Sequence, residues 1–102
     1  MAKKFIINQD RIVLSASVTY HEELAKDHLT TKGGGYWFVN DELKRLYLYG
    51  QSVDFGACTL EDLRTAIPKS YISVHWVGYE VYFSYNSSLA NAIKDAVLIG
   101  KL

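Results

Sequence analysis

Cysteine is nearly absent from this chain of 102 residues, in which Cys58 stands alone. A lone cysteine excludes an internal disulfide, so we expect a reducing compartment. No basic residue lies beside Cys58 in the sequence to lower the pKa of its thiol, and we interpret it as a small buried apolar side chain. No two of the histidines His21, His28 and His75 have the i, i+4 spacing of a helical zinc pair, so we expect no metal site.

Net charge is absent as well, because 11 lysines and arginines balance 11 aspartates and glutamates. A neutral chain lacks the long-range field on which non-specific nucleic-acid binding depends, so we predict no nucleic-acid partner. Long apolar runs are missing too. Residues 5–7 near the N-terminus form an apolar segment too short for a signal-peptide core or a membrane span. These absences predict a cytoplasmic protein without membrane association.

The chain does contain 49% hydrophobic and 14% aromatic residues, a composition typical of a folded protein. Its length predicts one domain that spans residues 1–102. Alternating apolar and polar side chains indicate strands that pair as hairpins. We expect three hairpins, which pair residues 5–7 with 12–20, 36–39 with 46–49, and 71–77 with 79–85.

Helices are indicated between and after these hairpins. Residues 21–26 do not continue the alternation of apolar and polar side chains, and this favours a short helix or turn. Thr59, with Asp62 three residues later, resembles an N-cap that opens a helix, and Pro68 ends this helix because proline has no N–H to donate. Apolar residues spaced three and four apart predict a last helix over residues 88–99.

The predicted fold class is therefore α+β. We expect a single domain with a mostly antiparallel or mixed six-stranded sheet, built from three hairpins, with two or three helices packed on it. The aromatic side chains of the last hairpin are interpreted as core and sheet surface rather than as a binding platform.

Two glycine-rich stretches are candidates for anion binding. Residues 30–35 form a polar loop that contains the triple glycine Gly33–Gly35, and its N–H groups form either an anion-binding nest or a flexible connector. Ser52 lies between Gly50 and Gly56 at the exit of a predicted strand, where its hydroxyl and nearby N–H groups can converge on an anion. Neither stretch has the pattern of a nucleotide-binding loop.

His21 is the candidate for acid–base chemistry. It stands where a long alternating strand ends, so it can be partly exposed and titrate near neutrality, as a general base must. The alternative is a structural or surface histidine. We interpret His28 and His75 as bystanders.

Together these features resemble the Janus/ocnus family, whose known members include the protein phosphohistidine phosphatases. The resemblance covers residues 4–76, and order and spacing carry it rather than any single block. The matching positions are Lys4 before the first strand, the pair Tyr20-His21, the triple glycine Gly33–Gly35, Tyr49-Gly50 with Ser52 and Gly56, and Val74 with Trp76 in the last strand.

The resemblance implies metal-independent hydrolysis of the P–N bond of phosphohistidine in a protein or peptide, with no cofactor. It implies that His21 is catalytic, either as a general base or as a nucleophile that carries a transient phosphate. The phosphate-binding residues it implies are Lys4, Tyr20, Gly33, Gly35, Ser52 and Asp54.

The chain also departs from the family pattern. Tyr36 stands where the family has an arginine, Asp54 stands where it has a small residue, and Lys3 competes with Lys4 for the lysine role. Residues 79–102 add a strand and a helix that can cover the sheet, close over the site or form a homodimer. These departures motivate the alternative of a non-catalytic phosphate- or partner-binding regulatory protein on the same fold.

Overall fold

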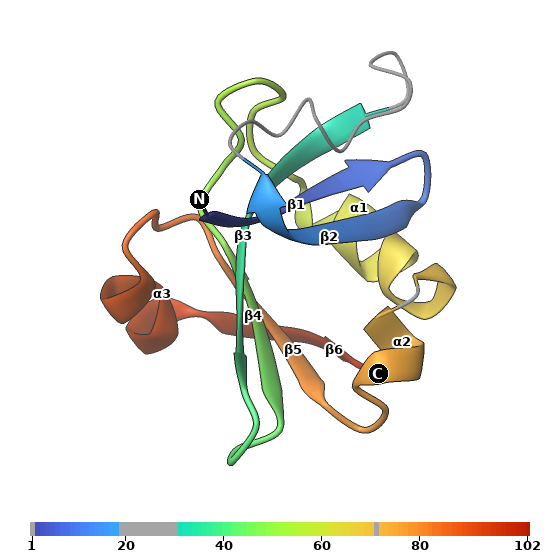
Figure 1. Cartoon of the computed structure of the whole chain (residues 1–102), viewed down its shortest axis with the longest axis vertical. Helices are drawn as coiled ribbons and strands as arrows, with labels where there is room; N and C mark the ends of the chain where they lie inside the picture. The colour runs from blue at the N-terminus through green and yellow to red at the C-terminus, as the bar shows by residue number, and fades with distance from the viewer. Residues whose placement is uncertain (1, 19–30, 71) are drawn as a thin grey trace.

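The computed structural model describes residues 2–18, 31–70 and 72–102 of the chain. The strands, in chain order, are β1 (Ala2–Asn8), β2 (Arg11–Val18), β3 (Thr31–Asn40), β4 (Arg45–Tyr49), β5 (Glu80–Ser84) and β6 (Val97–Lys101). The helices are α1 (Leu60–Ala66), the 3-10 helix η3 (Ile67–Lys69), α2 (Ile72–His75) and α3 (Leu89–Asp95). Figure 1 shows these elements as one compact body.

The strands form one six-stranded sheet in the order β2-β1-β3-β4-β5-β6. Neighbouring strands are antiparallel except β4 and β5, which run parallel. A parallel pair needs a crossover connection, and here the chain makes it through α1, η3 and α2. A mixed six-stranded sheet with helices packed on it confirms the predicted α+β fold class.

The first two predicted hairpins are confirmed as far as residue 18; residues 19 and 20 of the first hairpin, and the helix or turn predicted at residues 21–26, lie outside the described residues. β1 and β2 pair from Asn8 and Arg11 outwards across a tight turn, in which Gln9 has a φ of 59°. β3 and β4 pair from Asn40 and Arg45, and the Asn40 side chain accepts a hydrogen bond from the Leu43 N–H in the turn between them. The turn residues therefore fix both registers locally.

The third predicted hairpin is wrong. Ile72–His75 is the helix α2 rather than a strand, so β5 has no hairpin partner before it. β5 pairs instead with β4 on one side and β6 on the other. The resemblance of Val74 and Trp76 to a last strand fails for the same reason.

The predicted last helix is right at its start and wrong at its end. α3 begins at Leu89 and stops at Asp95, because Ala96 takes an extended backbone with a ψ of 142°. The chain then enters β6 and returns along β5. The last residues of the chain therefore add two strands and a helix to the sheet, rather than the one strand and one helix expected.

The main core lies between one face of the sheet and the α1–η3–α2 segment. Its buried apolar residues are Phe5, Ile7, Ile12, Leu46, Leu48, Cys58, Leu63, Ala66, Ile67, Ile72, Val81, Phe83 and Ile99. The predicted N-cap of α1 is confirmed, since Thr59 Oγ1 accepts a hydrogen bond from the Asp62 N–H at 3.1 Å. Pro68 lies just past α1, in η3, as expected for a residue that ends a helix.

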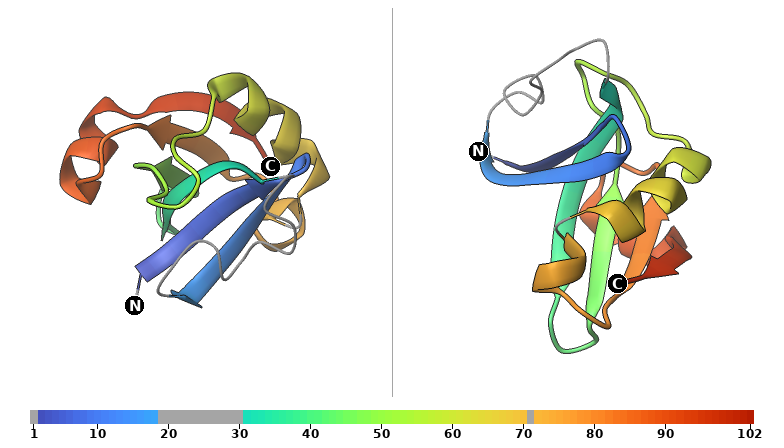
Figure 2. Two further views of the ribbon diagram at one scale, coloured as in Figure 1. Left: turned by 90° about the horizontal axis from the view of Figure 1, so that it is seen from above. Right: turned by 90° about the vertical axis from the view of Figure 1, so that its right-hand side faces the viewer.

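The other face of the sheet carries tyrosines and α3. Figures 1 and 2 show α3 on the opposite side of the strands from α1 and α2. Ala92 of α3 is fully buried, so it lies on the packed side of this helix. The strand registers align Phe38, Tyr47 and Tyr82 in one row across this face. The rings of Tyr47 and Tyr82 stack with their centroids 5.5 Å apart. Of the aromatic residues predicted to form core and sheet surface, Tyr82 lies on this face and Phe83 in the main core, as predicted.

None of the helices among the described residues is long and apolar enough to cross a membrane.

Candidate phosphate-binding site

The predicted site residues divide into two groups. Tyr20 and His21 lie outside the described residues. Lys4 lies on β1, the glycines Gly33 and Gly35 lie on β3, and both Ser52 and Asp54 lie in the segment that joins β4 to α1. Sheet pairing brings this second group together, because Lys4 is the register partner of Tyr36 on β3 and the Gly34 N–H donates to the Gly56 carbonyl at 3.2 Å.

The triple glycine is part of a strand, so the prediction of a polar loop over residues 30–35 is wrong from Thr31 onward. Gly34 and Gly35 are register partners of Ile6 and Phe5 on β1. A Cβ on Gly35 would lie 2.4 Å from the Tyr49 carbonyl oxygen, closer than real Cβ contacts come. The glycines therefore let β3 pack closely against the chain that leaves β4.

Gly33 has a second reason to be glycine. Its φ of 114° is a conformation that residues with a Cβ rarely adopt. A Cβ there would also lie 2.7 Å from the carbonyl oxygen of Ala57. The φ of Gly33 and its closeness to the Ala57 carbonyl therefore explain the glycine through the fold of the protein, without a ligand.

The Ser52 turn, residues 52–56, is closed by hydrogen bonds between its own residues. The Ser52 N–H donates to the Gly56 carbonyl at 3.1 Å, and the Gly56 N–H donates back to the Ser52 carbonyl at 2.9 Å. Inside this closed turn, Ser52 Oγ accepts hydrogen bonds from the Asp54 and Phe55 N–H groups at 3.2 and 3.1 Å. The Ser52 hydroxyl and the nearby N–H groups, which we expected to bind an anion together, are therefore hydrogen-bonded to each other.

The side chains of the turn point in different directions. Ser52 is 3% exposed, whereas the Asp54 side chain is exposed. The Asp54 N–H, which the family resemblance assigns to phosphate, is directed at Ser52 Oγ. Asp54 thus contributes its backbone to the interior of the turn and its carboxylate to the surface.

The two candidate lysines lie on opposite faces of the sheet. Lys3 Nζ is 5.1 Å from the ring centroid of Trp37, which packs against the main core. Side chains alternate along a strand, so Lys4 belongs to the other face, in register with Tyr36 and Tyr49. A Cβ on Gly50, two residues before Ser52, would lie 2.9 Å from the Tyr36 ring. Lys4 is therefore the lysine on the Tyr36 face of the sheet.

Cys58 lies just before α1 and is confirmed as a buried side chain. Burial, with a smaller contribution from Asp62, raises the pKa of its thiol to about 12. A thiol that stays protonated at neutral pH is a poor nucleophile. The Cys58 carbonyl accepts a hydrogen bond from the Tyr85 hydroxyl at 2.9 Å, which ties this segment to the end of β5.

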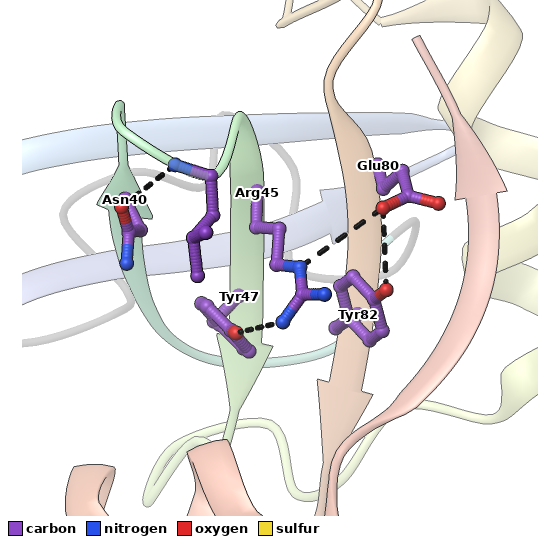
Figure 3. Close-up of polar contacts among 6 residues, drawn as sticks. Asn40, Arg45, Tyr47, Glu80 and Tyr82 are labelled. Carbon is purple, nitrogen blue, oxygen red and sulfur yellow. Dashed lines mark hydrogen bonds and ion pairs between the residues drawn. The ribbon is translucent and has the colours of Figure 1, made fainter.

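A polar cluster that the sequence analysis missed lies on the α3 side of the sheet (Figure 3). The Arg45 guanidinium donates to the Tyr47 hydroxyl at 3.4 Å and lies over the Tyr82 ring, 4.9 Å from its centroid. Its Nε is 4.0 Å from a Glu80 carboxylate oxygen. The hydrogen bond to Tyr47 is the largest cause that raises the pKa of Arg45. The alternation of Arg45, Tyr47 and Tyr49 along one strand was the signal for this cluster.

Two hollows in the described part of the chain are lined by none of the predicted site residues. One, of about 370 Å³, lies between β2 and α2, and the other, of about 600 Å³, lies beside the C-terminal end of β5. Within residues 2–18, 31–70 and 72–102, no three histidine, cysteine or acidic side chains gather as metal ligands.

Comparison of the chain with protein families, curated proteins and solved structures found no match.

Proposed function

We propose that this protein is a metal-independent phosphohydrolase that cleaves the P–N bond of phosphohistidine in a protein or peptide, in the cytoplasm. The observation that carries the proposal is the Ser52 turn, where two backbone N–H groups converge on one oxygen atom. That geometry suits a phosphate oxygen as well as a hydroxyl. The resemblance to the Janus/ocnus family supplies the reaction and the role of His21.

Phosphoryl transfer depends mostly on positioning and on stabilisation of charge at the phosphate oxygens. A phosphate oxygen that replaces Ser52 Oγ in the turn accepts from the Asp54 and Phe55 N–H groups. Rotation of the displaced Ser52 hydroxyl then lets it donate to a second oxygen. The Lys4 ammonium adds positive charge from the neighbouring strand.

The reaction consumes one water molecule and releases phosphate and neutral histidine. In one route, His21 takes a proton from the water whose oxygen attacks phosphorus, while the departing imidazole nitrogen of the substrate is protonated. In the other route, the His21 nitrogen attacks phosphorus first, and water then hydrolyses the phosphorylated enzyme. Both routes need unprotonated His21, so activity should fall as the pH drops through roughly 6 to 7.

The test is phosphate release from a phosphohistidine peptide by the full chain, with EDTA present throughout. We expect the wild type to turn over and His21→Ala to lose activity. Lys4→Ala should lower kcat/KM by roughly 10- to 150-fold, the value of one charge-assisted hydrogen bond. Lys3→Ala is the matched control, because Lys3 lies over Trp37 on the other face, and it should keep its activity.

A second candidate, a non-catalytic protein that binds phosphorylated partners, is favoured by one observation. Ser52 Oγ already occupies the position between the two N–H groups, so the turn is satisfied without a ligand. A folded wild type that binds the phosphohistidine peptide in calorimetry but releases no phosphate would establish this candidate. Equal losses of activity in Lys3→Ala and Lys4→Ala would contradict the proposed site.

A further inference from the structure

The strand β6 forms one edge of the sheet, and among the described strands it pairs only with β5. Two apolar side chains near its start are about half exposed: Val97 at 49% and Leu98 at 50%. They lie on opposite faces of the sheet, since Val97 is in register with Phe83 of the main core and Leu98 with Tyr82 of the α3 face. This edge therefore offers a peptide backbone with apolar surface on both sides.

Edge strands in soluble proteins are normally protected by charges, by proline or by a covering segment. From Ala96 to Gly100 the chain carries neither charge nor proline. The exposed Ile93 of α3 adds apolar surface just before the strand. The β5–β6 register shifts between Leu98 and Gly100, but the residues on either side leave an apolar edge without charges, and such an edge is a strand-pairing surface.

We propose that β6 pairs antiparallel with β6 of a second copy of this chain, so that the two sheets join edge to edge in a symmetric dimer. When two copies of one strand pair antiparallel, a two-fold axis relates them, and the assembly is complete with two chains. The backbone groups on the outer edge then gain partners, and Leu98 packs near its own copy. The interface is self-complementary without any further component.

The charges at the two ends of β6 favour this occupant over an unrelated strand. Asp95 lies two residues before the strand, where its Oδ1 accepts a hydrogen bond from the Ser84 hydroxyl, and Lys101 is the last residue of the strand. Antiparallel pairing centred on Leu98 brings Asp95 near the partner's Lys101, and symmetry repeats the contact. The Lys101 side chain is exposed and forms no ion pair with any other described residue, so its ammonium is available for this contact.

The test is the mass in solution of the full chain, of 11.6 kDa, by sedimentation equilibrium over roughly a hundredfold range of concentration. We expect the wild type to approach twice the chain mass at the high end. Leu98→Lys should stay monomeric, because it places two lysines at the centre of the interface. The control Val77→Lys changes a side chain that is 72% exposed in the turn before β5, and it should dimerise like the wild type.

A charge reversal tests the register. Lys101→Glu should raise the dimer Kd by roughly 2- to 30-fold, because the two exposed ion pairs become like-charge contacts. Lys94→Glu, an exposed reversal on α3, is its control. A wild type that is monomeric at every concentration would overturn the proposal, as would a dimer that survives Leu98→Lys. Phosphate release by Leu98→Lys separates this outcome from the proposed function, because the Ser52 turn is untouched.

Discussion

At the β2 edge of the sheet, the Ile12 N–H donates to Ser70 Oγ at 2.7 Å, and the Ser70 hydroxyl donates in turn to the Ala66 carbonyl. At the β6 edge, Val97 and Leu98 remain about half exposed. Among the described residues, one edge of the sheet is thus tied to the segment after α1, whereas the other edge pairs on one side only. A side-chain hydroxyl can occupy a backbone N–H of an edge strand, and where such contacts are missing, the surface suits a partner.

The helical segment between β4 and β5 explains the difference. It covers the core face of the sheet and ends next to β2, where η3 delivers Ser70 to the edge (Figure 2). Lys69 in the same segment forms an ion pair of 3.0 Å with Asp10 in the β1–β2 turn. α3 is short and leads straight into β6, so nothing comparable follows the other edge among the described residues.

The largest expected contrast comes from truncating one apolar side chain at each edge. Ile12 is 4% exposed and belongs to the main core, so Ile12→Ala should lower the free energy of unfolding by about 2–5 kcal/mol. Leu98→Ala should cost less than about 1 kcal/mol in the monomer. Urea denaturation at low protein concentration measures both. Equal losses would contradict the picture of one closed edge and one open edge.

The hydroxyl that closes the β2 edge should have an intermediate effect. Ser70→Ala leaves the buried Ile12 N–H and the Ala66 carbonyl without this partner, which should cost about 1–3 kcal/mol of unfolding free energy. Ser88→Ala is the matched control, since Ser88 is exposed and its side chain makes no capping hydrogen bond in α3. The control should change stability by less than about 0.5 kcal/mol in the same urea titration. A Ser70→Ala variant as stable as the control would show that the hydroxyl does not protect this edge.

The smallest effect is expected from the exposed ion pair beside the β2 edge. The hydrogen bond from Lys69 lowers the pKa of Asp10 below its usual value. A carboxyl with a lowered pKa in the folded state stabilises the protein above its unfolded pKa of about 3.9, and this contribution is lost as the pH falls through the folded value. Thermal melts should therefore show Lys69→Ala slightly less stable than the wild type at neutral pH and equal to it in acid. A difference in melting temperature that persists in acid would exclude this ion pair as its cause. Lys32→Ala, a change at another exposed lysine, is the control.

The parts of the fold that the sequence predicted are those that local chemistry determines. Turn residues and alternation were enough for the first two hairpins, and the Thr59–Asp62 spacing was enough for α1. The errors occur in short apolar segments whose sequence fits both the alternation of a strand and the spacing of a helix. Residues 71–77 alternate like a strand, yet Ile72–His75 is helical. Residues 96–99 continue a helical spacing, yet Val97 begins a strand whose pairing with β5 only the tertiary structure supplies.

The family resemblance placed the glycines and Ser52 in one site, and β3 and the Ser52 turn meet through the Gly34–Gly56 hydrogen bond. The site as a whole stays a prediction. The sequence did not reveal that Gly33 and Gly35 are required by close backbone packing. It also left Lys3 and Lys4 undecided, because only the register of β1 with β3 assigns each lysine to a face.

The buried Cys58 gives this protein an internal reporter of its own opening. A thiol reagent reacts with the thiolate, and a pKa of about 12 together with burial keeps that species scarce in the folded chain. Labelling must therefore wait for the segment before α1 to separate from the sheet, so its rate follows the free energy of that motion. Because the chain has one cysteine, the signal comes from a single place, and a mass spectrometer can follow it without any engineered probe.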